Sequence, residues 1–141
     1  MLVPPSPRVD PAGTIRLVGM TYIAGAVRAG QRRSVRLRFI VDSGAVYSVL
    51  PERAWRRLGL RPTRTAHFEL ADGTVITRGV SRCTFDVAGL SEISPVVLGG
   101  PRDAPLLGMV TLETLGLMLN PLTRELLPMQ LVLAAVAPRV A

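Results

Sequence analysis

One stretch constrains the fold of this chain most, because a strand pattern there ends in an acidic residue. Along residues 33–41 the apolar side chains fall on one face of an extended chain, at Val35, Leu37, Phe39 and Val41. This alternation has the period of a strand with one buried face. Asp42 follows directly, where a carboxylate is costly to place unless partners hold it or its charge is used. The stretch predicts a β domain that presents Asp42 at the end of a strand.

Length and composition limit the chain to one domain. It has 141 residues, of which 48% are hydrophobic, which suffices for a modest core but not for two domains. No apolar run reaches the length of a transmembrane helix, and the N-terminus shows no signal-peptide pattern. The single cysteine, Cys83, excludes an intrachain disulfide framework. We therefore expect a cytoplasmic protein that does not associate with a membrane.

The charge balance is basic, with a formal net charge of +7, and all 17 basic residues are arginine. Such a balance can indicate nucleic-acid binding. However, the arginines are scattered along the sequence, and three Phe, two Tyr and one Trp do not provide a set of positions for base stacking. Nucleic acid is thus an unlikely partner on these grounds, although an arginine-rich nucleic-acid-binding β-barrel stays open as an alternative.

Most of the remaining chain also has strand patterns. Residues 1–13 are rich in proline and predict a flexible N-terminal arm. Alternating or β-branched runs predict strands at residues 14–20, 21–28, 65–70, 75–79, 80–88, 93–98, 117–120 and 124–133. Residues 51–60 and 109–115 predict short helices that stop at Gly59 and Gly116. Trp55 is expected to anchor the first helix to the core.

Two loops besides the one at Asp42 have distinctive patterns. Ala71-Asp72-Gly73-Thr74 lies between two strand patterns, and Asp-Gly in that position is a strong hairpin signal. Leu106-Leu107-Gly108 repeats the pattern of an apolar strand that runs into a glycine. The repeat suggests an approximate internal two-fold relation between the halves of the domain.

The ionisable residues of the chain suggest one kind of chemistry. No spacing of acids, His67 or Cys83 is typical of a metal site or a Ser–His–Asp triad; we expect His67 to be structural and Cys83 to lie in the core. One carboxylate cannot do both acid and base work on a peptide bond, whereas two close carboxylates that share a proton can. Since the chain offers one such loop, we infer a symmetric homodimer in which Asp42 of each subunit meets at the axis.

The sequence resembles the retroviral-like (retropepsin-like) aspartic proteases, and most closely their bacterial single-domain relatives. Asp42-Ser43-Gly44-Ala45 is similar to the active-site loop of that family. Leu70-Ala71-Asp72-Gly73-Thr74 is similar to its flap hairpin, and Leu106-Leu107-Gly108 to its second loop. The resemblance covers about residues 14–133, which leaves 134–141 as a C-terminal tail.

The resemblance implies an all-β fold: a closed antiparallel acid-protease-like barrel with one or two short helices and one lobe per chain. It also implies an aspartic endopeptidase that cleaves peptide or protein substrates by water, without metal or cofactor, and Ser43 bonding across the dimer axis. Two departures are that Met109 and Val110 replace the Arg and Asp or Asn of retroviral members, and that Gly73 stands alone in the flap. A catalytically inactive dimer that binds peptides or serves in assembly is the alternative.

Overall fold

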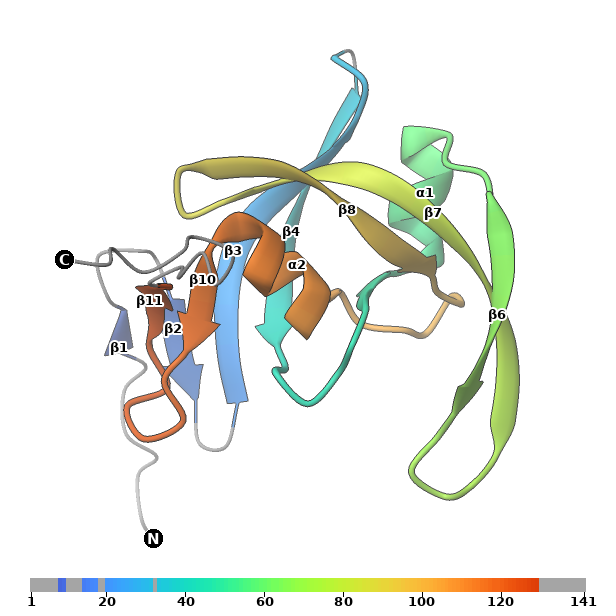
Figure 1. The fold of residues 1–141 in the computed structure, drawn as a ribbon. Helices are drawn as coiled ribbons and strands as arrows, with labels where there is room; N and C mark the ends of the chain where they lie inside the picture. The colour runs from blue at the N-terminus through green and yellow to red at the C-terminus, as the bar shows by residue number, and fades with distance from the viewer. Residues whose placement is uncertain (1–7, 10–13, 18–19, 32, 130–141) are drawn as a thin grey trace, which may run out of the picture.

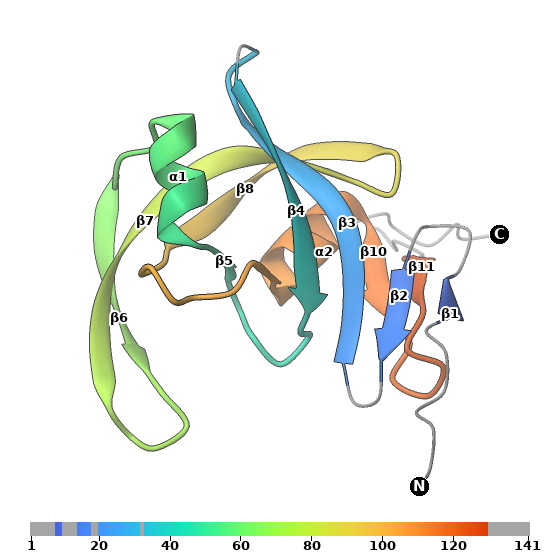
Figure 2. The same cartoon turned by 180° about the vertical axis from the view of Figure 1, so that it is seen from behind.

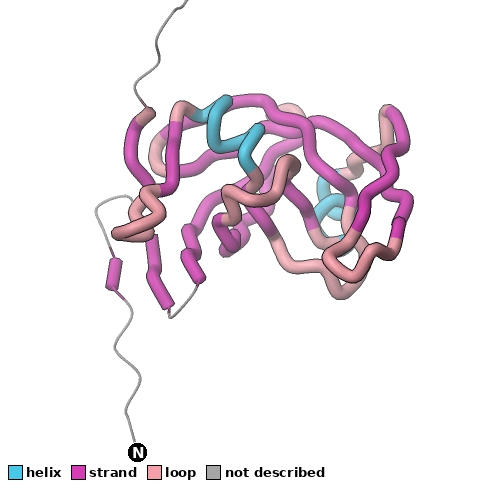
Figure 3. Tube along the Cα trace, turned by 60° about the horizontal axis from the view of Figure 1, so that its bottom comes forward, coloured by secondary structure: helices cyan, strands magenta, loops and turns pink. Residues whose placement is uncertain are grey.

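The computed structural model describes residues 8–9, 14–17, 20–31 and 33–129. Figure 1 and Figure 3 show that strands make up most of this part of the chain, together with two short helices. The elements are β1 (Arg8–Val9), β2 (Thr14–Leu17), β3 (Met20–Ala29), β4 (Arg33–Val41), β5 (Ser48–Leu50), α1 (Glu52–Leu58), β6 (Arg64–Glu69), β7 (Val75–Val87), β8 (Leu90–Leu98), β9 (Leu106–Leu107), α2 (Met109–Leu115), β10 (Leu117–Leu119) and β11 (Leu126–Pro128).

One large sheet contains nine of the strands, in the order β1-β2-β3-β4-β9-β5-β8-β7-β6, and a further pairing joins β3 to β7. The hydrogen-bonded ladder from β3 through β4, β9, β5, β8 and β7 therefore returns to β3. Most pairs are antiparallel, but β4–β9 and β5–β8 are parallel. A mostly β domain with two short helices is confirmed, whereas the closed barrel stays a prediction.

The predicted strand before Asp42 forms as expected, and its apolar face enters the core. β4 has the predicted bounds, and Leu37, Phe39 and Val41 are buried. The ring centroid of Phe39 lies 5.9 Å from that of Phe85 on β7, at an interplanar angle of 47°. Cys83, also on β7, is buried in the same core cluster, which confirms its predicted place. Burial raises the pKa of the Cys83 thiol to about 12, so this thiol is a core group rather than a nucleophile.

The prediction of two strands at residues 75–79 and 80–88 is wrong, because β7 runs without a break from Val75 to Val87. The predicted break lies directly after Gly79. A Cβ at this position would lie 2.7 Å from Cβ of Pro62. Gly79 therefore lets another segment cross the strand closely, which is one of the usual roles of glycine within a strand.

Both predicted helices form, and each ends at the predicted glycine. Gly59 after α1 and Gly116 after α2 are left-handed, with φ of 71° and 72°. The anchoring role of Trp55 is confirmed, since this side chain packs against the core and its Nε1 donates to Gly99 O at 2.8 Å. The second helix buries Thr111, Leu112 and Leu115 against β5, β8 and β10.

The ends of the described chain form two small hairpins, and Figure 2 shows both on the opposite side of the molecule from the β6–β7 hairpin. β1 pairs with β2, so two residues of the predicted N-terminal arm belong to the sheet. β11 pairs with β10 of the same chain. The tail at 134–141 lies outside the described residues, and no helix among the described ones could span a membrane.

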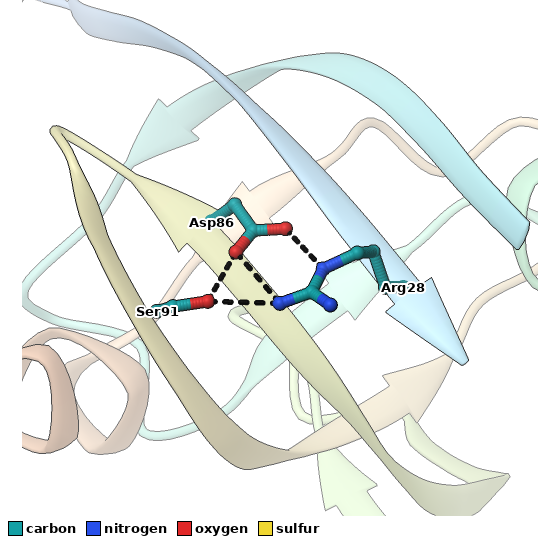
Figure 4. Close-up of polar contacts among 3 residues, drawn as sticks. All are labelled: Arg28, Asp86 and Ser91. Carbon is teal, nitrogen blue, oxygen red and sulfur yellow. Dashed lines mark hydrogen bonds and ion pairs between the residues drawn. The ribbon is translucent and has the colours of Figure 1, made fainter. Parts of the chain in front are cut away.

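An ion pair fastens the sheet on the side of the β7–β8 turn (Figure 4). Arg28 of β3 donates from Nε to Asp86 Oδ2 at 2.6 Å and from Nη2 to Asp86 Oδ1 at 3.1 Å. Ser91 Oγ accepts from Arg28 Nη2 at 2.9 Å and donates to Asp86 Oδ1. The hydrogen bond from Arg28 holds the pKa of the Asp86 carboxyl below its usual range. These contacts join β3, β7 and β8 across the sheet.

Candidate active site

Asp42 lies in an exposed loop at the end of β4, as the sequence predicts. Its carboxylate Oδ1 accepts a hydrogen bond from the backbone N–H of Gly44 at 2.9 Å, and its own N–H donates to Leu107 O at 3.0 Å. The N–H of Ala45 donates to the Asp42 carbonyl at 3.2 Å. Backbone groups therefore fix the carboxylate, while its side chain stays open to solvent.

The second predicted loop lies directly against the first. Besides the bond to Leu107, the N–H of Met109 donates to Ala45 O at 2.8 Å, and that of Val110 donates to Val46 O at 3.0 Å. β9 also pairs in parallel with the end of β4, where Val41 is opposite Leu107. The structure thus brings together the predicted residues of both loops, although more than 60 positions separate them in the sequence.

Gly108 lies at the closest approach of the two loops. A Cβ at this position would lie 2.5 Å from the carbonyl carbon of Tyr47 and 2.9 Å from Val46 O. These are backbone atoms, which cannot swing away as a side chain can. Glycine is therefore required at position 108 for the contact, whatever other function the loop has.

Three hydroxyl residues under the loops were not predicted as a group. Ser48 Oγ accepts from the N–H of Gly108 at 3.0 Å and shares a hydrogen bond with Thr111 Oγ1. Thr111 Oγ1 in turn lies 2.8 Å from Ser94 Oγ. Ser48, Ser94 and Thr111 are fully buried, each with 0% exposure. The sequence signal available was a hydroxyl residue at the buried positions of three apolar elements.

The third predicted motif forms the tip of the β6–β7 hairpin. All five of its residues are exposed: Leu70, Ala71, Asp72, Gly73 and Thr74. Leu70 N donates to Thr74 O at 2.7 Å, and Thr74 N donates to Asp72 Oδ1 at 2.8 Å. The hydrogen bond to Thr74 lowers the pKa of the Asp72 carboxyl. The predicted hairpin is confirmed, and its turn is held by its own backbone and by Asp72.

A cleft of about 660 Å³ lies between the Asp42 loop and this hairpin. In Figure 1 the loop after β4 and the tip of the β6–β7 hairpin extend toward the same side of the molecule. Four of the predicted residues line the cleft, namely Gly44, Ala45, Leu70 and Leu106. The other predicted residues do not line it, and Asp42 lies two positions before the lining segment 44–47. The volume falls in the usual range of ligand-binding clefts.

An aromatic pair that was not predicted forms part of the cleft wall. The ring centroid of Tyr47 lies 6.1 Å from that of Phe68, at an interplanar angle of 88°. Arg64 Nη2 donates to the Tyr47 hydroxyl at 3.4 Å, and its guanidinium carbon lies 5.9 Å from the Tyr47 ring. These contacts join the Asp42 loop to β6 of the hairpin. No local pattern could reveal them, because they depend on how the two segments pack.

Charged groups are also present in the cleft, on its largely apolar lining. Arg78 is half-buried there, and its Nη1 donates to the carbonyl of Thr77 at 3.1 Å. Asp103 Oδ2 accepts from Gly100 N at 2.7 Å. His67 is exposed and shares a hydrogen bond between its Nδ1 and Thr77 Oγ1 at 2.9 Å. His67 thus lies on the hairpin, and its hydrogen-bond partner there is Thr77 rather than Ser43 or Ser48, the hydroxyl residues that a triad would need.

Ser43 differs from its neighbours because its side chain has no hydrogen bond to the described part of the chain. It is exposed next to Asp42. The predicted bond across a dimer axis therefore stays a prediction. Within the described ranges, no cluster of three or more His, Cys, Asp and Glu residues could hold a metal ion.

Comparisons with known proteins show the family of the chain. A family model described as "gag-polyprotein putative aspartyl protease" matches residues 30–114, a range that contains all three predicted motifs. A comparison with curated proteins found no match. Among the matching solved structures, the solution structure of Simian Foamy Virus (mac) protease is 23% identical, with a TM-score of 0.47, over 64% of this chain and 91% of that one. The chain belongs to this gag-polyprotein aspartyl protease family, and it is a retropepsin-like aspartic protease by sequence, as the motifs predicted.

Proposed function

We propose that the chain is an aspartic endopeptidase that works as a homodimer, with Asp42 of each subunit as the catalytic pair. The observation that carries the proposal is the placement of Asp42. Its carboxylate is exposed and accepts a hydrogen bond at 2.9 Å from the N–H of Gly44, which is the first residue of the segment that lines a cleft of about 660 Å³. An exposed carboxylate in this position adds little to the stability of the fold, so a role in catalysis on a bound peptide explains it better.

The exposed loop provides a way for a second carboxylate to approach. Two carboxylates placed side by side cannot both ionise, so they share one proton, and one acts as base while the other acts as acid. Asp42 already makes its intrachain hydrogen bond on one face through Oδ1. Ser43 is exposed beside it, available for a bond to the other subunit. A symmetric dimer supplies the second Asp42 without any other residue of this chain.

In the proposed reaction, the ionised Asp42 takes a proton from a water molecule held between the two carboxylates. The water oxygen attacks the peptide carbonyl carbon, while the protonated Asp42 gives its proton to the carbonyl oxygen. Collapse of the resulting diol breaks the C–N bond: the Asp42 that took the water proton gives it to the amide nitrogen, and the other Asp42 takes the proton that a diol hydroxyl loses. The carboxylate pair is then again singly protonated. The β6–β7 hairpin acts as the flap, which covers the bound peptide and excludes water.

The test compares Asp42→Asn with a matched exposed acid, Glu92→Gln on β8. Both variants remove one negative charge and keep the shape of the side chain. Cleavage is followed with a library of quenched fluorescent peptides between about pH 4 and pH 7, and Trp55 fluorescence reports the fold. We expect Asp42→Asn to lose at least about 10³-fold in kcat, since it removes acid–base catalysis and the nucleophile's base together, while Glu92→Gln stays near wild type. Equal activity of Asp42→Asn and wild type would refute the proposal.

The contacts of three arginines count against the alternative of a nucleic-acid-binding protein. Arg28 pairs with Asp86, Arg38 stacks on Tyr22 with its guanidinium carbon 4.6 Å from the ring centroid, and Arg56 bonds to Glu52. These three arginines contact neighbouring groups on β3, β4 and α1. We therefore expect that the protein shows no nucleic-acid binding of the kind that weakens steeply as the salt concentration rises.

A further inference from the structure

Most hydrogen bonds between the two loops join backbone to backbone, but one of them uses the side chain of Ser48. Four consecutive residues of the second loop, 107–110, each bond to the Asp42 loop or to β5. Three of these contacts join backbone to backbone, so they survive any substitution that keeps the chain in place. The fourth joins the N–H of Gly108 to the Ser48 hydroxyl at 3.0 Å. It is the contact in this set that the sequence specifies through a side chain.

The Ser48 hydroxyl is in turn held by a chain of buried hydroxyls. Because Ser48 accepts from Gly108, its single proton is free to go to Thr111, which is its other partner. Thr111 can then donate to Ser94 at 2.8 Å, and Ser94 Oγ donates to the carbonyl of Pro95 at 3.2 Å. With this direction every hydroxyl accepts once and donates once. The chain begins at a buried N–H and ends at a carbonyl, and no proton lacks an acceptor.

Because the three hydroxyls are buried, breaking one of the hydrogen bonds between them is costly. Each of the three hydroxyl residues is 0% exposed, so bulk water does not reach them. Removing one partner of a buried hydrogen bond leaves the other unsatisfied, and this costs more than the bond itself contributes. The chain also spans three elements, since Ser48 belongs to β5, Thr111 to α2 and Ser94 to β8.

We propose that this chain of hydroxyls positions the catalytic loop, and that Ser48 is a positioning residue for Asp42, acting through Gly108. The proposal rests on the proposed function for its kinetic consequence. Gly108 follows Leu107, whose carbonyl accepts the N–H of Asp42, so a shift of the Gly108 backbone moves a direct partner of Asp42. The hydroxyl chain thereby connects the buried faces of α2 and β8 to the position of the carboxylate.

The test uses two variants and one rescue. Ser48→Ala removes the acceptor of the Gly108 N–H. Thr111→Val keeps the shape but breaks the chain one step away, and Thr111→Ser restores the hydroxyl. Val87→Ala on β7 is the control, because it makes a cavity in the core away from both loops. Each variant is measured for kcat and KM per folded dimer, and for the hydrogen exchange of the Gly108 amide by NMR.

We expect Ser48→Ala to lower kcat about 10- to 100-fold with KM little changed, and to speed exchange of the Gly108 amide. Thr111→Val should give a smaller loss that Thr111→Ser reverses, and Val87→Ala should lower stability but keep kcat. If the wild type is active and Ser48→Ala and Thr111→Val keep its kcat, or lose no more than Val87→Ala, the inference is overturned. If the wild type cleaves nothing, the proposed function fails instead, and the amide exchange alone decides: an unchanged Gly108 rate in Ser48→Ala contradicts the positioning role.

Discussion

Replacing Gly108 by alanine tests the contact between the two loops directly. The added Cβ would lie 2.5 Å from the carbonyl carbon of Tyr47, 2.6 Å from its oxygen and 2.9 Å from Val46 O. The first separation is about 0.9 Å short of the 3.4 Å at which ordinary van der Waals contact begins. Since the neighbours are backbone atoms, the loops must move apart by nearly this amount.

The expected cost follows from that displacement. Forcing a methyl group into a packed site typically costs about 1–3 kcal/mol of stability. A misplacement of about 1 Å at a catalytic group reduces kcat on the order of 100-fold. Gly108→Ala should therefore lower the free energy of unfolding by about 2 kcal/mol and lower peptide cleavage far more than partial unfolding explains.

The matched control is Gly100→Ala in the neighbouring loop. A Cβ there meets Asp103 Oδ2 at 3.7 Å and Arg78 Nη2 at 3.8 Å, which are ordinary contacts. Urea unfolding followed by Trp55 fluorescence gives the stability of both variants, and peptide cleavage gives their kcat. Gly108→Ala with the stability and kcat of Gly100→Ala would refute the close packing on which the site depends.

Three further predictions concern other parts of the fold. Arg28 lowers the pKa of Asp86 in the folded state, so the stabilisation by this pair is present above the unfolded pKa of about 3.9 and is lost as pH falls through the lowered folded pKa. The difference in free energy of unfolding between wild type and Asp86→Asn should therefore shrink below about pH 4. A difference that is constant with pH would contradict this. The buried Cys83 thiol, whose pKa is raised to about 12, should react with a thiol reagent at pH 8 only after unfolding, whereas rapid labelling of the native protein would show it to be accessible. Ala88 has φ of 53° in the β7–β8 turn, so Ala88→Gly should raise the free energy of unfolding by about 1 kcal/mol. A lower free energy of unfolding for this variant, measured with urea, would show that the turn carries no strain.

The elements that the sequence predicted well are those with a local signal. The alternation before Asp42 gave both bounds of β4, and the glycines gave the ends of α1 and α2. Gly79 misled because the same residue that interrupts a strand pattern also permits a close crossing, here by Pro62. The distinction depends on a neighbour 17 positions away, which no local pattern contains.

The candidate site was predicted in its motifs but not in its supports. Asp42 and the loop at Gly108 were found because short motifs mark them, and the structure places them in contact. The links from Ser48 to Thr111, and from Tyr47 to Phe68, join residues that are more than 20 positions apart. These residue types are common on strands and helices, so the sequence does not mark them as parts of the site. Only the packing of the elements shows their contacts.

Mixing wild-type chains with Asp42→Asn chains tests the central claim of a shared catalytic pair most directly. Equal amounts of the two are combined, allowed to exchange subunits, and assayed for peptide cleavage per wild-type chain. If each active site needs Asp42 from both subunits, mixed dimers are inactive and activity per wild-type chain falls to about half. Activity per wild-type chain that is unchanged by the added variant, with exchange confirmed by mass spectrometry, would contradict the claim.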